Sequence, residues 1–352
     1  MPKPKPRTTL MPLGVCGLVF LLVATPGHGA GLASKSEIRN SKLENPNANL
    51  GAALTIFDFR ASSFDLSPAS SPEPPAPSFD GARAFGDLKH LVAFGPRPAG
   101  SPALAEARRW IIAQLKEAGA QVEEDSFTAS TPMGSLPMTN LIAKFPGAQP
   151  KIVMVTGHYD TKREEDFRFV GANDGGSSAA LLLELARALG ARKHALTYWL
   201  VFFDGEEAVR EWTDTDSVYG SRHLVQKLTS QGELGRIQAM ILVDMIGDAD
   251  LAIHREYNST PWVMDAVFAA ARRLGYAQSF RDDPIAVDDD HIPFINAGVA
   301  AADLIDLDYG PNNSYWHTDK DTVEHCSPQS LTIVGRVVLA TLEDLEKSSH
   351  TK

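Results

Sequence analysis

Side chains of the types that bind metal ions or transfer protons lie next to successive apolar runs of this sequence. A histidine follows residues 152–156, an acidic pair follows residues 197–203, and an aspartate lies at the end of residues 240–245. A further aspartate stands in a glycine-rich loop before an apolar helix, and a second histidine follows residues 299–305. The six residues are His158, Asp174, Glu206, Glu207, Asp244 and His317. Their repeated placement favours one shared site over six unrelated positions.

Imidazole and carboxylate groups are the ligands that zinc binds in a tetrahedral shell, and a catalytic zinc keeps one position open for water or substrate. Asp174, Glu207 and His317 supply three protein ligands of this kind. His158 and Asp244 supply a second set, with Asp174 able to bridge two ions as in two-metal peptidases. The sequence therefore predicts one Zn²⁺, or two if the protein is a two-metal peptidase.

The neighbouring glutamates are predicted to have different roles. Adjacent side chains of an extended segment point in opposite directions, so Glu206 and Glu207 cannot face the same atom. If Glu207 binds the metal, Glu206 faces the substrate as a general base.

Each of these residues also has an ordinary structural explanation. Asp174 precedes a helix and could be an N-cap, a Glu–Glu pair is common on solvated surfaces, and Trp316 beside His317 could be core packing. Only the recurrence of ligand-type residues at successive strand ends favours a metal site.

The elements that position these residues alternate between strand and helix. The sequence predicts strands at residues 140–145, 152–156, 197–203, 240–245 and 299–305. It predicts helices at residues 103–118, 177–189, 261–274 and 328–347. This order predicts an α/β fold, a three-layer αβα sandwich with a central mixed, mostly parallel sheet. In such a sheet ligands bind beyond the carboxyl ends of the strands, which is where the chemical residues fall.

The amino-terminal part of the chain differs in character from the rest. Residues 1–30 have a basic start, an apolar stretch and small residues, so they are predicted to be a secretory signal peptide. Residues 31–79 are rich in proline and serine and are predicted to be a disordered linker. Residues 80–352 form the predicted catalytic domain. The protein is expected to be exported, either periplasmic or secreted, without stable membrane insertion after cleavage.

Composition narrows the range of partners. The chain has 44 acidic and 33 basic residues and a formal charge of −11, which argues against a nucleic-acid partner. Its two cysteines are Cys16, in the predicted signal, and Cys326, so no internal disulfide is expected after cleavage. Neither feature predicts an oligomeric state.

Three stretches of the sequence resemble the glutaminyl cyclase branch of the zinc aminopeptidase family. The similarity covers most of residues 80–345. The stretches are residues 202–208 with Trp212 and residues 216–223, then residues 289–294, then residues 316–318.

The resemblance implies roles for the chemical residues. Asp174, Glu207 and His317 would bind one zinc, and Glu206 would be the acid/base residue.

The resemblance also implies a substrate pocket. Asp244 and Asp289 would form a hydrogen-bonded pair near the leaving group, and Trp212 and Trp316 would line the pocket around the substrate side chain. Asp303 stands where animal cyclases have a histidine that contacts substrate or pocket, so it is included among the substrate-binding candidates.

The implied reaction is the cyclisation of an amino-terminal glutamine to pyroglutamate with release of ammonia, on the amino termini of peptides and proteins. A two-zinc aminopeptidase that hydrolyses amino-terminal residues is the alternative, since this chain has all five ligands that such an enzyme needs. They are His158, Asp174, Glu207, Asp244 and His317. A binding module without catalysis is a third reading, which predicts lost ligands or a lost base.

Overall fold

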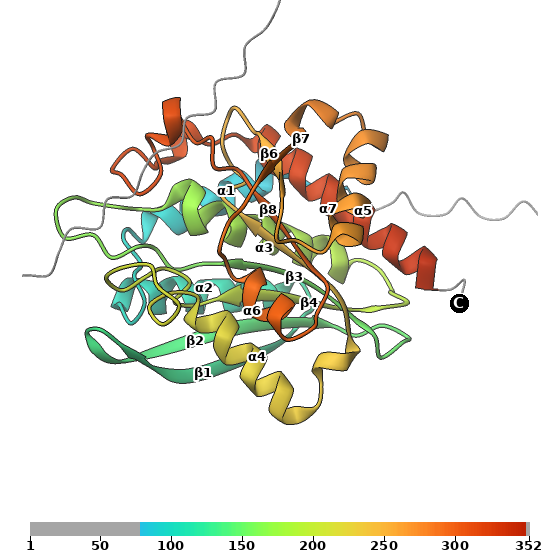
Figure 1. The fold of residues 1–352 in the computed structure, drawn as a ribbon, viewed down its shortest axis with the longest axis horizontal. Coiled ribbons are helices and arrows are strands. Elements are labelled where there is room, and N and C mark those ends of the chain that lie inside the picture. Colours follow the sequence, from blue (N-terminus) through green and yellow to red (C-terminus); the bar gives the residue numbers. More distant parts are fainter. Residues whose placement is uncertain (1–77, 350–352) are drawn as a thin grey trace, which may run out of the picture. The chain divides into compact units, whose positions relative to one another are not determined.

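The computed structural model describes residues 78–349 (Figure 1). The predicted signal peptide and nearly all of the predicted linker lie outside the described residues. The first described residues already belong to the core, because Phe79 is buried and packs against Gly335. The core thus begins one residue before the predicted start of the domain.

A six-stranded mixed sheet is the centre of the fold, with the strand order β1-β2-β4-β3-β5-β8. Strand β1 pairs antiparallel with β2, and β2 pairs antiparallel with β4. The other three neighbouring pairs, β4 with β3, β3 with β5 and β5 with β8, are parallel. The strands are β1 Gln121–Thr131, β2 Gly134–Phe145, β3 Ile152–His158, β4 Thr197–Phe203, β5 Ile237–Asp244 and β8 Ala301–Ile305.

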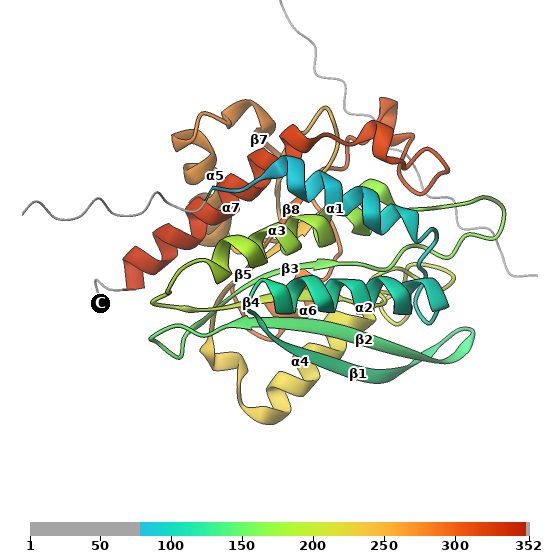
Figure 2. The ribbon, with the colours of Figure 1, turned by 180° about the vertical axis from the view of Figure 1, so that it is seen from behind.

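Helices cover both faces of this sheet. One face carries α1 Gly81–Ala93, α2 Pro102–Glu117, α3 Ser178–Gly190, α5 Pro261–Arg273 and α7 Pro328–Ser349. Figure 2 shows α1, α2 and α3 in front of the strands. The opposite face carries α4 Tyr219–Gln231 and α6 His291–Asn296, which lie in front of the sheet in Figure 1. The predicted three-layer αβα sandwich with a mixed, mostly parallel sheet is confirmed.

The apolar run of β4 shows why both faces must be covered. Successive side chains of a strand point to opposite faces. Tyr198, Leu200 and Phe202 accordingly join the core under α1, α2, α3, α5 and α7, while Trp199 and Val201 join the core under α4 and α6. A strand that is apolar on both sides is stable only between two helical layers.

Several elements differ from the sequence prediction, and the helices α1, α4 and α6 were not predicted. The edge strand β1 was not predicted, since its sequence is mostly polar and only a few of its side chains are buried. A π-helical turn, η1 Ala172–Ser177, precedes α3. A separate parallel pair, β6 Ile253–Glu256 with β7 Phe280–Ile285, lies between β5 and α6 in the sequence.

Among the helices of residues 78–349, none has both the length and the apolar character needed to cross a bilayer.

Candidate metal centre and its cavity

The strand ends bring the six predicted residues to one edge of the sheet. His158 is the last residue of β3, Asp244 is the last of β5, and Glu206 and Glu207 lie in the loop just after β4. Asp174 lies in η1, between β3 and α3. Because β3, β4 and β5 run parallel, their carboxyl ends meet at the same edge, as the sequence predicted.

Asp174, Glu207 and His317 form one candidate metal group. The Nε2 atom of His317 lies 3.2 Å from Asp174 Oδ2 and 3.3 Å from Glu207 Oε1. Both carboxylates are buried, whereas His317 is partly exposed, so the group opens toward solvent on the histidine side.

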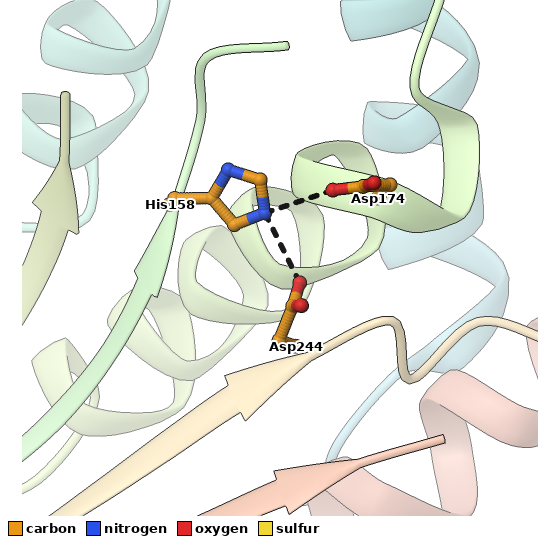
Figure 3. A group of neighbouring side chains, drawn as sticks. All are labelled: His158, Asp174 and Asp244. Atoms are coloured by element: carbon orange, nitrogen blue, oxygen red, sulfur yellow. Dashed lines mark hydrogen bonds and ion pairs between the residues drawn. The ribbon is translucent and has the colours of Figure 1, made fainter. Parts of the chain in front are cut away.

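His158, Asp174 and Asp244 form a second candidate group, shown in Figure 3. The Nε2 atom of His158 lies 3.2 Å from Asp174 Oδ1 and 3.1 Å from Asp244 Oδ1. Asp174 therefore turns one carboxylate oxygen to each histidine, as a bridging ligand would.

The group of Asp174, Glu207 and His317 fits a zinc ion in two respects: the distances between its ligand atoms, and the lack of hydrogen-bond donors to its carboxylate oxygens. Zinc–ligand bonds of roughly 2.0–2.1 Å in a tetrahedron place neighbouring ligand atoms about 3.3 Å apart, close to the distances around His317 Nε2. No described residue donates a hydrogen bond to the buried Asp174 Oδ2 or Glu207 Oε1. Buried carboxylate oxygens without a donor are costly unless a cation neutralises them.

Local backbone conformation shapes both ligand loops. His317 has a φ of 51°, a left-handed conformation that side-chain-bearing residues adopt rarely and often at functional sites. In η1, Gly175 has a φ of 77°, and a side chain there would clash with the ring of His158 and the carbonyl of Asp160. Glycine at this position is required for Asp174 and His158 to approach each other.

Glu206 and Glu207 diverge as predicted. Glu207 faces His317, whereas the Oε2 atom of Glu206 lies 3.7 Å from Nδ1 of His158 and lines the cavity. Asp160 contacts both Glu206 and His158. Its Oδ1 accepts the Glu206 backbone N–H at 3.3 Å and lies 3.4 Å from His158 Nδ1.

Burial and crowding of like charges change the acidity of these groups. Burial raises the pKa of Glu206 well above its ordinary value; His158 opposes the shift, and Asp289 and Glu207 add to it. Burial lowers the pKa of His317, but the carboxylates of Glu207 and Asp174 outweigh it and raise this pKa to about 10. A metal ion bound by this group would therefore compete with the histidine proton.

Asp289 lies near Asp244 without a direct hydrogen bond between them among residues 78–349. Both line the cavity. Asp244 Oδ1 instead accepts the backbone N–H of Met245 at 2.8 Å, and Asp289 Oδ1 accepts that of Asp290 at 2.5 Å. Burial, then the Asp244 charge, raises the pKa of Asp289 well above its usual range.

A cavity of about 340 Å³ opens beside the metal group. Asp174, Glu206 and Glu207 lie on its lining, and Trp212 and Trp316 contribute to its walls. These two indoles are 40% and 41% exposed, so neither is a core side chain, and packing in the core does not explain them.

Asp303 does not lie on this cavity. Its side chain is fully buried, its two oxygens accept no hydrogen bond from the described residues, and Oδ2 lies 3.9 Å from His291 Nδ1. The predicted contact of Asp303 with substrate therefore has no support in the structure. All residues of β8 are buried, and the side chain of Asp303 lies beside His291 instead.

Three polar residues at or beside the cavity were not among the sequence predictions. Asp160 contacts His158, Lys162 lines the cavity, and the Asp321 carboxylate accepts the backbone N–H of Asp174. The spacing of Asp160, two residues after His158, was a usable signal, because alternate residues of an extended segment share a face.

Comparison with known proteins gives consistent relatives. The glutaminyl-peptide cyclotransferase-like protein of Bos taurus is 36% identical over 278 residues, which cover 70% of this chain and 72% of that protein. The glutaminyl-peptide cyclotransferase of Drosophila melanogaster is 30% identical over 338 residues, covering 86% and 93%. A crystal structure of a glutaminyl cyclase from an Acidobacteriales bacterium has a TM-score of 0.76 at 40% identity, covering 79% of this chain and 99% of that one.

The sandwich and its histidine–carboxylate cluster define an α/β protein with a candidate metal centre at the carboxyl edge of a mixed sheet. Peptidase family M28 matches residues 140–342, which contain all of the candidate ligands. The chain belongs to peptidase family M28, in its glutaminyl-peptide cyclotransferase branch, in agreement with the predicted resemblance.

Proposed function

We propose that this chain is a zinc-dependent glutaminyl-peptide cyclotransferase, which converts amino-terminal glutamine to pyroglutamate. The observation that carries the proposal is a buried carboxylate, Glu206, that lines the cavity beside the candidate metal group without belonging to it. The glutaminyl cyclases among its relatives support it over the aminopeptidase alternative.

Asp174, Glu207 and His317 are the proposed zinc ligands. When bound there, zinc supplies a Lewis acid that increases the electrophilic character of a carbonyl carbon. The three residues offer two carboxylates and one imidazole, a donor set that leaves a fourth position of a tetrahedral shell open.

Glu206 is the proposed proton carrier. In the reaction the α-amine nitrogen bonds to the γ-carbonyl carbon of the glutamine, and the bond from that carbon to the amide nitrogen breaks. The amine loses one proton and the departing ammonia gains one, so a single carboxylate balances the reaction. The raised pKa of Glu206 suits this role, because a carrier works best when its pKa lies near the working pH.

Asp289 and Asp244 are proposed to act on the leaving group. A protonated Asp289 donates a hydrogen bond to the amide nitrogen or the ammonia, and Asp244 remains the acceptor that holds His158. The two residues share the cavity wall, so both are within reach of a bound side chain.

Trp212 and Trp316 are proposed to hold the substrate in a folded conformation. Aromatic walls favour a neutral amide over a charged side chain, since burying a charge costs more than burying a neutral polar group. Holding the amine against the γ-carbon lowers the entropic part of the activation barrier, an effect that in well-oriented reactions reaches ~7–11 kcal/mol.

One zinc ion per chain is proposed. The charged form of His158 is favoured between Asp174 and Asp244: burial lowers its pKa, but Glu206, Asp244 and the other neighbouring carboxylates raise it well above its usual value. Two zinc ions would instead favour the aminopeptidase. Metal analysis of the purified protein decides, with one equivalent expected.

The activity is tested by mass spectrometry of a Gln-led peptide and of the same peptide led by alanine. Loss of ammonia from the first and no change in the second is expected. Release of free amino acids from both would support the aminopeptidase and overturn the proposal. A binding module would alter neither peptide.

Export is proposed on the basis of the predicted signal peptide at residues 1–30, with residues 31–79 as a linker to the catalytic domain. The mass of the protein recovered outside the cytoplasm should show loss of about the first thirty residues. Recovery of only the full-length chain, in the cytoplasmic fraction, would refute this.

A further inference from the structure

Asp321 is a buried carboxylate that binds the backbone of the metal-ligand loop. Its Oδ1 accepts the backbone N–H of Asn173 at 2.7 Å, and its Oδ2 accepts that of Asp174 at 3.1 Å. The hydroxyl of Tyr309 donates a third hydrogen bond to Oδ1 at 2.8 Å. Its side chain is only 1% exposed, so these donors take the place of water.

The other end of the same loop is bound by Arg97, which is fully buried. Its guanidinium donates to the carbonyl oxygens of Val170 at 2.9 Å and Gly171 at 3.2 Å, and also to those of Leu91 and Gly95. Arg97 therefore fixes the carbonyls that enter the loop, while Asp321 fixes the N–H groups around the ligand itself.

Asp321 also follows His317 by only four residues, so it belongs to the second ligand-bearing loop. Its hydrogen bonds to the backbone of Asp174 connect the two loops directly. The loop of Asp174 needs such support, since Gly171 and Gly175 both have positive φ and glycine backbone is costly to order.

We propose that Asp321 is a positioning residue of the metal centre, which joins the Asp174 and His317 loops and orients Asp174 before metal binds. Asp174 belongs to both candidate metal groups, so a shift of its backbone would displace ligand atoms in each. Groups that hold metal ligands in place commonly contribute 10–100-fold to metal affinity. The proposal rests on Asp174, Glu207 and His317 as ligands.

The test is the zinc affinity of the full chain, measured by competition with a chromophoric chelator in the unsubstituted protein and in Asp321→Asn. The amide keeps the size of the carboxylate but replaces one acceptor oxygen by an N–H₂ group, which faces a backbone N–H. Zinc binding is expected to weaken by roughly 10–100-fold.

Asp306→Asn is the matched control. Asp306 is also fully buried and accepts two backbone N–H groups, from Ala252 at 2.7 Å and Asp308 at 3.0 Å, but neither of these residues is a candidate ligand or adjacent to one in the sequence. This control is expected to lower the thermal unfolding midpoint of the metal-free protein comparably while leaving zinc affinity unchanged. An equal loss of zinc affinity in both variants would show a general effect of destabilisation and overturn the proposal.

A third variant, Asp174→Ala, separates this inference from the ligand assignment. If Asp174→Ala loses zinc and Asp321→Asn binds it as tightly as the unsubstituted chain, the positioning role is wrong and the ligands stand. If Asp174→Ala binds zinc normally, the ligand assignment itself is wrong, and the positioning role with it.

If Asp321→Asn does not fold, Tyr309→Phe replaces it, because that change leaves the carboxylate in place and removes one of its three donors. Weaker zinc binding, by a smaller factor than in a ligand variant, is then expected. Zinc affinity equal to that of the unsubstituted chain would overturn the proposal.

Discussion

Glu206 and Glu207 show how two identical side chains, adjacent in sequence, acquire different chemistry. Glu207 points to His317 and its Oε1 has no hydrogen-bond donor among the described residues, which suits a metal ligand. Glu206 points to the cavity beside His158, and burial raises its pKa. The backbone alternation after β4 produces this difference.

Glu206→Gln should reduce kcat by about 10²–10⁴-fold, because the amide cannot carry the proton. The protein should still contain its zinc, since Glu206 lies outside the metal group. Glu207→Gln is the matched variant and should lose zinc. Turnover assays together with metal analysis check both, and loss of zinc from the Glu206 variant would show that the two roles are exchanged.

Trp212→Ala should lower kcat/KM by about tenfold, or ~1.4 kcal/mol, because the cavity loses an aromatic wall. The exposed indole contributes little to the core, so the thermal unfolding midpoint should change little. Trp262→Ala is the control, since that indole is 46% exposed on α5 and does not line the cavity. Equal effects on kcat/KM in both would contradict the role of Trp212.

The candidate ligands could be selected from sequence because zinc ligands have characteristic side chains and residues of these types stood at successive strand ends. Asp321 was not predictable, because its partners are backbone N–H groups, which every residue except proline carries. Asp303 was predicted from its place in the sequence, which does not show that its side chain is buried beside His291 and away from the cavity.

Element boundaries were well predicted where the chain is apolar. Strand β4 spans Thr197–Phe203, as predicted, and helix α5 ends one residue earlier than predicted. The polar edge strand β1 was missed, because an edge strand buries little and its sequence carries no strong alternation. The β6–β7 pair was missed for the same reason, since the exposed side chains of β7 are mostly charged.

One buried carboxylate ties β6 to the segment that precedes α6. Glu256 ends β6, and its oxygens accept the backbone N–H groups of Asn258 at 2.9 Å, Ser259 at 2.6 Å and Val287 at 3.2 Å. Burial raises the pKa of Glu256, but His291 and these hydrogen bonds outweigh it and lower the pKa to about 2.

Glu256→Gln should destabilise the metal-free protein by about 1–3 kcal/mol at neutral pH, because charge-assisted hydrogen bonds are lost. A carboxyl whose pKa is about 2 when folded and about 4.5 when unfolded stabilises the fold above pH 4.5 and loses that contribution as pH falls toward 2. Urea unfolding of both proteins should give a constant difference from pH 8 to about 5 that shrinks below 4.5. A difference independent of pH would contradict this.

At the scale of the molecule, the metal centre joins segments that are far apart in the chain. His158 and Asp244 are the last residues of β3 and β5. Glu207 follows β4, Asp174 lies in η1, and His317 follows β8. A ligand that binds only the folded state adds to its stability, by about 2.7 kcal/mol at a free concentration 100 times Kd.

Removing zinc with a chelator should therefore lower the thermal unfolding midpoint by several degrees, and added zinc should restore it. Scanning calorimetry with and without zinc measures the change. Asp174→Ala is the control and should unfold at the same temperature in both conditions. A zinc-dependent midpoint in that variant would place the stabilising ion elsewhere.

The position of His317 after the last strand of the sheet also fixes when the centre can be completed. A nascent chain that has not yet been extended to His317 contains the carboxylates of Asp174 and Glu207 but lacks the third candidate ligand of that group. Stalled or prematurely terminated products that stop short of His317 should therefore emerge without their ion. Zinc content thereby distinguishes finished chains from incomplete ones in a mixed preparation.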